Sequence, residues 1–238
     1  MENFQTVLIK NAQAVGLALT AEQAEKLSAY FAMLEEASKS FNLISYTDVE
    51  EMVTRHFLDA LAAPALKLLA PFRNIIDVGT GAGFPGLPLA IVLNRPQITL
   101  LDSLRKRTDF LQTVVEKLAL PNTTVVHARA EDYARTACRE RYDAALSRAV
   151  ASLPVLLEYT LPFVRVGGAV LAWKGPSAPA EIAEAEHAAS ILGSRELKAH
   201  PYTISEHQNF FIVEAKKFRP APSIYPRKAG IPTKNPLK

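Results

Sequence analysis

The feature of this chain that most constrains its fold is a cluster of glycines directly after a short apolar stretch. Residues 75–78 read I-I-D-V, and glycines follow at positions 79, 81, 83 and 86. A buried parallel strand, a glycine-rich turn and a helix produce this pattern, because glycine adopts positive φ freely and lets a ligand approach the backbone. We expect a strand over 74–78 and a helix over 87–93, whose first N–H groups point at the ligand.

Two classes of ligand fit this loop. Gly81, Gly83 and Gly86 spell the G-x-G-x-x-G motif of dinucleotide-binding enzymes. Asp77 opposes a dinucleotide, because its carboxylate would repel the pyrophosphate. The same carboxylate favours a ligand with a cationic end, such as the ammonium of S-adenosylmethionine (SAM). D-x-G-x-G-x-G is the loop of Rossmann-like SAM-dependent methyltransferases, in which Gly79, Gly81 and Gly83 would admit the cofactor.

The rest of the chain alternates between apolar runs of strand length and helical patterns, which predicts a mostly parallel sheet. Further strands are expected over residues 98–101, 124–127, 142–146 and 168–173, and an antiparallel hairpin over 201–204 and 209–215. Such a terminal hairpin is common among methyltransferases and unusual in NAD domains. We therefore predict an α/β fold, a Rossmann-like class I SAM-dependent methyltransferase with a C-terminal antiparallel hairpin and an N-terminal helical extension.

Polar residues follow the ends of three predicted strands, where open parallel sheets bind ligands. Asp102 ends the second strand and is placed to accept both hydroxyls of a ribose. Ala130 and Glu131 follow the third strand, in the loop that lies near the adenine in nucleoside-binding sheets. Arg148 follows the fourth strand and would hold the methionine carboxylate of the cofactor or a phosphate of the substrate.

The segment before the sheet is predicted to be helical and to pack on it. Thr47 and Glu50 have the spacing of a capping box, and a helix is expected to follow them. His56 falls on its apolar face and is interpreted as a docking histidine. Arg55 and Asp59 are expected to pair on the opposite face, one helical turn apart.

Basic residues gather towards the C-terminal end. Seven of them, and no acidic residue, follow Glu214: Lys216, Lys217, Arg219, Arg227, Lys228, Lys234 and Lys238. Prolines at 220, 222, 226, 232 and 236 predict an extended strap. A basic strap indicates a polyanionic partner, and we expect it to bind RNA and not the cofactor. The predicted organisation is a helical extension over 1–60, a methyltransferase domain over 61–218 and the strap over 219–238.

Composition narrows the class of protein. With 49% hydrophobic and 21% charged residues, the chain is expected to be an ordinary soluble globular protein. We expect no signal peptide, and no apolar run approaches the ~20 residues of a membrane span. The single cysteine, Cys138, excludes an internal disulfide, and the histidines lack metal-ligand spacing. We expect a cytoplasmic monomer without a metal or a membrane partner.

At this point several segments together resemble one family, RsmG, also called GidB. They are D-V-G-T-G-A-G-F-P-G-L-P-L-A-I (77–91), L-L-D-S-L-R-K-R (100–107), A-E (130–131), S-R-A-V-A (147–151), K-G (174–175) and Y-P-R-K-A-G-I-P-T-K-N-P-L (225–237). The segment 42–61 is similar to the N-terminal part of that family. G-A-G-F-P-G and the Y-P-R-K ending are specific to it, whereas the other motifs occur in many methyltransferases.

The resemblance implies a bacterial enzyme that uses SAM to methylate ring nitrogen 7 of one guanine in 16S ribosomal RNA, within the small subunit or an assembly precursor. In that family, cofactor contacts fall on the positions of Gly79, Phe84, Ala130, Glu131 and Arg148. Nitrogen 7 carries a lone pair and no proton, so no catalytic base is required. The enzyme would act by aligning and desolvating the reactants.

Contact with RNA is expected from a set of mostly basic residues: Arg55, His56, Lys106, Arg107, Lys174, Arg227 and Lys228. Two of them stand in the first turn of a predicted helix, where positive charge is unfavourable unless it faces a phosphate. Two other functions stay open at this stage. One is a nicotinamide-dependent oxidoreductase, and the other is a SAM-binding, RNA-interacting protein without catalysis.

Overall fold

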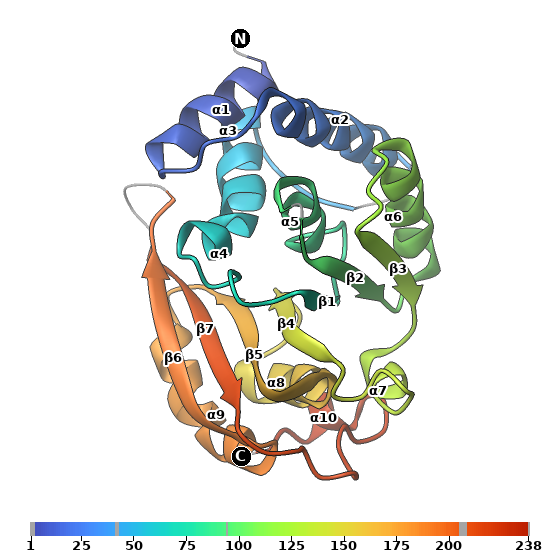
Figure 1. The fold of residues 1–238 in the computed structure, drawn as a ribbon, viewed down its shortest axis with the longest axis vertical. Coiled ribbons are helices and arrows are strands. Elements are labelled where there is room, and N and C mark those ends of the chain that lie inside the picture. The colour runs from blue at the N-terminus through green and yellow to red at the C-terminus, as the bar shows by residue number, and fades with distance from the viewer. Residues whose placement is uncertain (1–2, 41–42, 94, 205–208, 238) are drawn as a thin grey trace.

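A computed structural model describes residues 3–40, 43–93, 95–204 and 209–237. These residues form a seven-stranded sheet of order β3-β2-β1-β4-β5-β7-β6 (Figure 1). Its strands are β1 (Asn74–Val78), β2 (Gln97–Asp102), β3 (Thr123–His127), β4 (Tyr142–Arg148), β5 (Val164–Lys174), β6 (Ser194–Tyr202) and β7 (Phe210–Lys217). The first five strands are parallel and β7 is antiparallel to both neighbours, which confirms the predicted fold class.

The order of the strands reverses between β1 and β4, at the centre of the sheet. From β1 the chain moves outwards through β2 to β3 and then returns to pair β4 with the other side of β1. Crossovers leave such a point in opposite directions, so a crevice opens at the carboxyl ends of the strands. The glycine-rich loop after β1 and the segment after β4 therefore meet where a ligand is expected.

The terminal hairpin is longer than the sequence predicts. Its first arm, β6, begins at Ser194, whereas residues 201–204 were expected to form it. Strand β6 is an edge strand that carries Arg195, Glu196 and Lys198, and edge strands commonly carry charges that prevent pairing with other chains. The segment therefore lacks the apolar alternation by which strands are recognised. The predicted turn at 205–208 lies outside the described residues.

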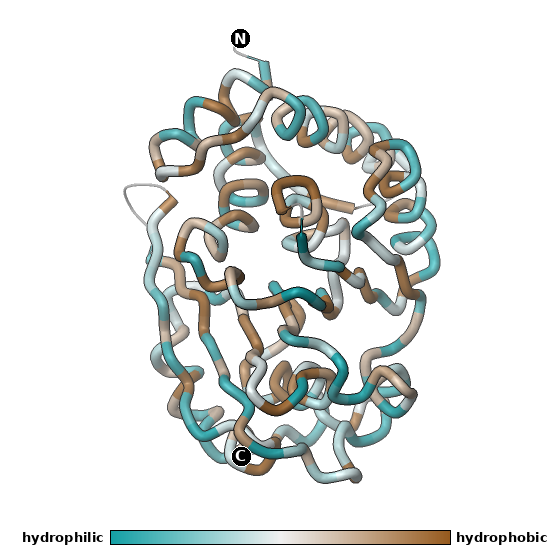
Figure 2. The backbone as a smooth tube through the Cα atoms, in the orientation of Figure 1, coloured by the Kyte–Doolittle hydropathy of each residue, from teal (hydrophilic) through white to brown (hydrophobic). Residues whose placement is uncertain are grey.

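Helices cover both faces of the sheet. The described helices are α1 (Phe4–Ala14), α2 (Ala21–Ser38), α3 (Val49–Met52), η1 (Val53–Leu58), α4 (Ala62–Ala65), α5 (Gly86–Val92), α6 (Arg105–Lys117), α7 (Ala130–Tyr133), α8 (Leu153–Thr160), η2 (Leu161–Phe163), α9 (Ala178–Ile191) and α10 (Ile231–Lys234). None of these helices is long and apolar enough to cross a bilayer. The chain around α5 is predominantly hydrophobic (Figure 2), and this short helix is buried over residues 86–91.

Successive residues of β1 point to opposite faces of the sheet and pack in two separate hydrophobic clusters. Ile75 packs with α5, α6 and the N-terminal helices, whereas Ile76 packs with α8 and α9 on the opposite face. Both side chains are fully buried. The two-residue period of a strand thus gives each layer of helices its own side of the sheet.

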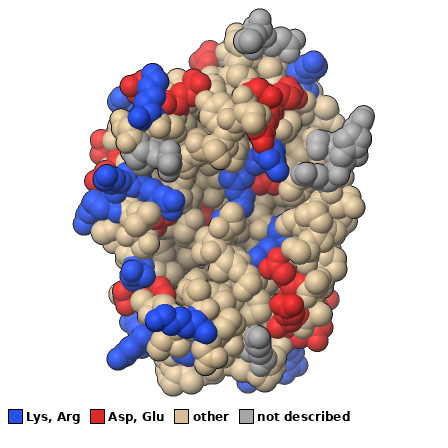
Figure 3. Space-filling model, turned by 180° about the vertical axis from the view of Figure 1, so that it is seen from behind, with Lys and Arg blue, Asp and Glu red and all other residues tan. Residues whose placement is uncertain are grey.

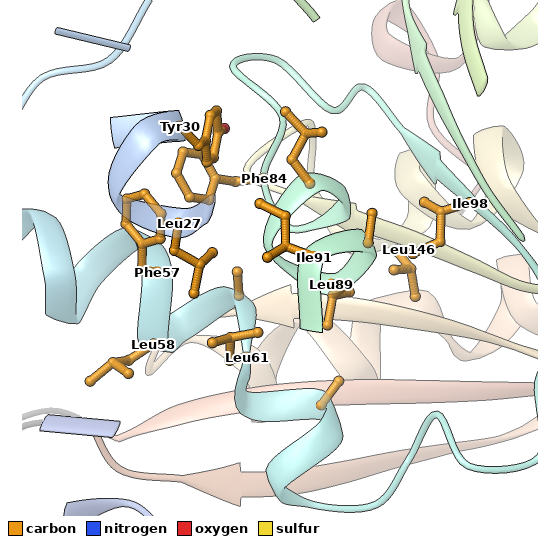
Figure 4. Close-up of a cluster of buried hydrophobic side chains, with 14 of the residues drawn as sticks. Leu27, Tyr30, Phe57, Leu58, Leu61, Phe84, Leu89, Ile91, Ile98 and Leu146 are labelled. Carbon is orange, nitrogen blue, oxygen red and sulfur yellow. The ribbon is translucent and has the colours of Figure 1, made fainter. Parts of the chain in front are cut away.

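The N-terminal helices hold the glycine-rich loop in place. Tyr30 of α2 and Phe57 of η1 contact Phe84, which lies between the loop and α5 (Figure 4). The hydroxyl of Tyr30 also donates a 2.7 Å hydrogen bond to the carbonyl of Ala82. A Cβ atom on Gly83 would lie 2.7 Å from the same hydroxyl oxygen. Close packing against Tyr30 is therefore a reason for glycine at this position.

Two local expectations before the sheet were wrong. Asp48, one residue after Thr47, caps helix α3 by accepting a 2.8 Å hydrogen bond from the backbone N–H of Glu51. Arg55 does not pair with Asp59 but with Glu51, at 2.6 Å. The second difference arises because Asp59 faces the interior, where it is 6% exposed.

Candidate active site

A cavity of about 380 Å³ lies at the carboxyl ends of the parallel strands. Its lining comes from the loops after β1, β2, β3 and β4 and from Tyr159 of α8. Four predicted cofactor residues are brought together there: Gly79, Asp102, Ala130 and Glu131. Small-molecule sites have volumes of roughly 300–1,000 Å³. This cavity is therefore the candidate cofactor site.

Asp102 places a buried carboxylate at the cavity, and several hydrogen bonds hold it there. Its carboxylate is 4% exposed and accepts backbone N–H groups of Gly81 and Leu104, each at 2.9 Å. Arg107 approaches at 3.5 Å. Each carboxylate oxygen has about two acceptor positions. Oδ2 already accepts from Gly81 and Arg107, whereas Oδ1 accepts only from Leu104 and keeps a position for a further donor. One ribose hydroxyl can therefore donate to Oδ1, and a second can donate to Oδ2 in place of the long contact with Arg107.

Apolar groups supply a second reason to place a nucleoside here. Leu104 and Val150 are 52% and 38% exposed, and both line the cavity. Leaving such side chains in water is unfavourable, and a flat heterocycle between them would cover them. Gly79 lies beneath this region, because a Cβ atom on it would stand 2.6 Å from a methyl group of Val150. The residues present therefore fit the adenosine part of SAM.

Asp77 lies beneath the loop and does not line the cavity. It is fully buried, and its Oδ2 accepts hydrogen bonds from the Thr80 hydroxyl (2.7 Å) and the Gly86 N–H (2.8 Å). Burial raises its pKa to about 6, although these hydrogen bonds and the charge of Arg148 act in the opposite direction. Its Oδ1 has no partner among the described residues. Contact between Asp77 and the cofactor ammonium stays a prediction.

Phe84 does not present its ring to the cavity. The ring is 3% exposed and packs against Tyr30 and Phe57, with centroid separations of 5.5 and 5.3 Å. The guanidinium of Arg148 lies 5.1 Å from its centroid on another side. The ring is part of the core, so a contact between Phe84 and the cofactor would be made by its backbone, and that contact stays a prediction.

Arg148 lines a second cavity, of about 260 Å³, and not the first one. Its guanidinium donates to the carboxylate of Asp59 at 2.7 Å and to the carbonyl of Arg55 at 3.0 Å. It also lies 3.3 Å from Nδ1 of His56. Arginine only donates, so this ring nitrogen is the acceptor. Arg148 is thus held by residues of the N-terminal segment and lines the second cavity. Its expected contact with the methionine carboxylate of the cofactor, or with a phosphate of the substrate, stays a prediction.

The π-helical geometry of η1 makes this arrangement possible. The backbone N–H of Asp59 bonds to the carbonyls of Thr54 and His56 and not to that of Arg55, whose carbonyl accepts from Arg148. Single π-turns inside helices occur frequently at functional sites. Burial, followed by the charge of Arg148, lowers the pKa of His56 to about 4. His56 is therefore neutral near pH 7.

Asp59 is the central residue of this cluster, and sequence reasoning missed its role. Besides Arg148, its carboxylate accepts a short hydrogen bond from the hydroxyl of Tyr202. Its backbone carbonyl accepts a 2.7 Å bond from the indole N–H of Trp173. The partners are distant in sequence, and no local motif announces them.

The residues predicted to contact RNA are placed in two different ways. Arg107 lines the first cavity and Arg55 the second, and Lys106 and Lys228 are exposed. In contrast, Lys174 is 9% exposed and donates to Glu181 at 2.7 Å and to the carbonyl of Ala151 at 2.8 Å. Its charge is already paired inside the protein, but it also lines the second cavity, so its contact with RNA stays a prediction.

The C-terminal strap bonds to two residues that line the cofactor cavity, although none of its own described residues lines it. Arg227 forms a bidentate pair with the fully buried carboxylate of Glu158, with a shortest distance of 2.6 Å. The backbone N–H of Gly230 donates to Glu131 at 3.3 Å, and Thr233 bonds to the hydroxyl of Tyr159 at 2.9 Å. Glu131 and Tyr159 both line the cavity. Arg227 is thus paired inside the protein, and its contact with RNA stays a prediction.

Sequence comparisons agree on one family. The GidB family, described as rRNA small subunit methyltransferase G, matches residues 23–209. The ribosomal RNA small subunit methyltransferase G of Clostridium beijerinckii is 44% identical over 237 residues, which cover 99% of each chain. The enzyme of the same name from Leuconostoc citreum is 44% identical over 225 residues, covering 93% of this chain and 94% of that one.

Comparison with solved structures supports the fold. An O-methyltransferase from Bacillus cereus in complex with SAH matches with a TM-score of 0.57 and 18% identity, covering 80% of this chain and 91% of that chain. A cofactor-bound protein from MTB matches with a TM-score of 0.58 and 16% identity, covering 82% and 91%. At such low identity the likeness concerns the fold alone.

Proposed function

The chain belongs to the GidB family of small-subunit rRNA methyltransferases, and we propose that it transfers the methyl group of SAM to ring nitrogen 7 of one guanine in 16S rRNA. It is a SAM-dependent methyltransferase. The observation that carries the assignment to this site is the cavity with Asp102 at the end of β2, placed where Rossmann-like sheets hold a ribose. The family places the acceptor in the RNA of the small subunit.

Nitrogen 7 as the acceptor atom agrees with the side chains around the site. SAM, when bound, supplies an electrophilic methyl group. An exocyclic amine or a ribose hydroxyl would have to lose a proton on methylation, and a general base would then be expected nearby. Asp102 is already an acceptor of backbone N–H groups, and His56 has its Nδ1 occupied by Arg148. The protein's contribution is alignment of the two reactants and exclusion of water.

We further propose that RNA covers the face that carries the cavities. Arg55, Lys106, Arg107 and Lys228 are the predicted RNA contacts that the structure leaves in or beside solvent. One face of the molecule is hollowed near its middle, with Lys and Arg atoms on both sides of the hollow (Figure 3). Phosphates bound there would release counterions, so RNA affinity would fall with salt. We propose a cytoplasmic monomer that acts on the small subunit or its assembly precursor.

One assay separates this function from its rivals. The protein is incubated with labelled SAM and small subunits that lack the modification, and the label recovered in 16S rRNA is counted. Label in the RNA supports the enzyme. Binding of SAM without transfer would support a non-catalytic RNA-interacting protein. Tight binding of NADH, measured in a parallel titration, would support an oxidoreductase.

A further inference from the structure

The second cavity lies directly beside the cofactor cavity and has no role in the account so far. Ala149 lines both cavities, so a single residue after β4 forms part of the wall between them. Ala149 has a φ of 56°, in the left-handed region that residues other than glycine rarely adopt. Such conformations concentrate at functional sites, where surrounding structure holds them. A group seated in the second cavity is therefore adjacent to the cofactor.

Two aromatic rings stand at this cavity. Tyr202 and Phe210 face each other across the hairpin, with ring centroids 5.8 Å apart and planes inclined by 27°. Both are half-buried. Phe210 packs into neither of the two hydrophobic clusters formed by the described residues. A partly exposed ring that the core does not use offers a stacking surface, and proteins commonly bind unpaired bases on such rings.

Arg148 provides polar groups on another side of the cavity. A guanidinium has five N–H donors. Among the described residues, Nη1 donates to Arg55 and Asp59 and Nη2 contacts His56, so the Nε–H and one Nη2–H have no acceptor. Oxygen 6 of guanine is an acceptor next to nitrogen 7. A donor to oxygen 6 would hold the base and leave the lone pair of nitrogen 7 free.

Resting on the proposed function, we propose that the second cavity is the subsite for the acceptor guanine. The base stacks on Phe210 and Tyr202, and Arg148 donates to its oxygen 6. Asp59 is a positioning residue, because it fixes both Arg148 and the hydroxyl of Tyr202. Nitrogen 7 attacks the methyl carbon as the bond from that carbon to sulfur breaks, and the positive charge passes from the sulfonium to the base.

The chain offers a direct readout of occupancy. Trp173 is its only tryptophan, and it lines the second cavity. Its fluorescence can therefore be followed while guanosine monophosphate is added to the full-length protein. We expect saturable quenching in the wild type. Phe210→Ala should raise the apparent Kd at least about tenfold, and Phe210→Leu, which keeps apolar volume without an aromatic face, should do so as well. Ribose 5-phosphate should produce no quenching.

Matched controls separate stacking from folding. Phe218→Ala removes an aromatic ring that is 51% exposed and lines neither cavity, so it should bind guanosine monophosphate like the wild type. Tyr202→Ala, which removes the second stacking ring, should weaken binding. SAM affinity, measured by calorimetry, should be unchanged in both Phe210 variants. Their KM for the small subunit should rise.

The outcomes are distinguishable from failure of the proposed function. If the wild type transfers no methyl to 16S rRNA, the proposed function fails, whatever the fluorescence shows. If the wild type transfers methyl and both Phe210 variants keep its KM, kcat and nucleotide affinity, the subsite proposal alone is overturned. Equal quenching by ribose 5-phosphate would also overturn it, because the cavity would then hold a phosphate.

Discussion

Arg148, at the end of β4, donates a 2.7 Å hydrogen bond to Asp59, which follows η1. The side chains are 16% and 9% exposed. This pair joins the N-terminal helices to the segment that separates the two cavities. The helical extension is therefore bonded to the wall of the second cavity and is not only a covering for the sheet.

Asp59→Ala should destabilise the protein markedly, because it leaves the buried charge of Arg148 without its carboxylate partner. Breaking a buried pair in this way costs roughly 3–5 kcal/mol. Urea unfolding measures the change. Glu36→Ala, which removes one partner of the exposed Lys39–Glu36 pair, serves as the control and should leave the midpoint unchanged. Equal stability of the Asp59→Ala variant and the wild type would contradict a structural role for the pair.

Asp102→Ala should weaken SAM binding by about one to two orders of magnitude, since charge-assisted hydrogen bonds contribute roughly 1.5–3 kcal/mol. Calorimetric titration measures the affinity, and circular dichroism checks the fold. Asp132→Ala is the matched control, because Asp132 is exposed and lies outside the cavity lining. A variant with wild-type affinity would remove Asp102 from the cofactor site.

Arg227→Gln and Lys228→Gln should affect different properties of the protein, although they alter adjacent residues. Arg227→Gln leaves the buried carboxylate of Glu158 unpaired, so we expect the variant to be less stable. Because the same helix, α8, carries the cavity residue Tyr159, we also expect SAM binding to be about tenfold weaker, ~1.4 kcal/mol. Lys228→Gln removes an exposed charge and should only weaken RNA binding and flatten its salt dependence. Unchanged SAM affinity in Arg227→Gln would show that the strap does not support the cofactor cavity.

His56 should make stability depend on pH below neutrality. Its folded-state pKa of about 4 lies below the unfolded value of ~6.5. The unfolded chain thus binds more protons in this window, and the wild type loses stability as pH falls through it. The raised pKa of Asp77 has the opposite effect on stability in this window, but Asp77 is present in both the wild type and the His56→Gln variant, so its effect cancels in the comparison. The stability of His56→Gln relative to the wild type should therefore rise from pH 6.5 to 4, and a constant difference would contradict the neutral, buried state.

The part of the site that local pattern encodes could be predicted from the sequence. Asp102 was identifiable because a carboxylate at the end of a predicted strand must lie at the carboxyl edge of the sheet. The same reasoning located Gly79 and Glu131, and all three line the cavity. Their assignment to the cofactor stays a prediction that binding measurements test.

Pairings across the fold could not be predicted in this way. Asp59 and Arg148 are 89 residues apart, and Glu158 and Arg227 are 69 apart. A charged residue in a helix carries no local sign of whether its partner is solvent or a buried ion. The basic strap was therefore interpreted by its charge alone, whereas Arg227 pairs inside the protein.

The central claim concerns the atom that accepts the methyl group, and one measurement tests it most directly. Small subunits that lack the modification are methylated with labelled SAM, the 16S rRNA is digested to nucleosides, and the labelled nucleoside is identified by mass spectrometry and chromatography against standards. The account predicts 7-methylguanosine from a single position. Label in a base methylated on an exocyclic amine, or on a ribose hydroxyl, would contradict it.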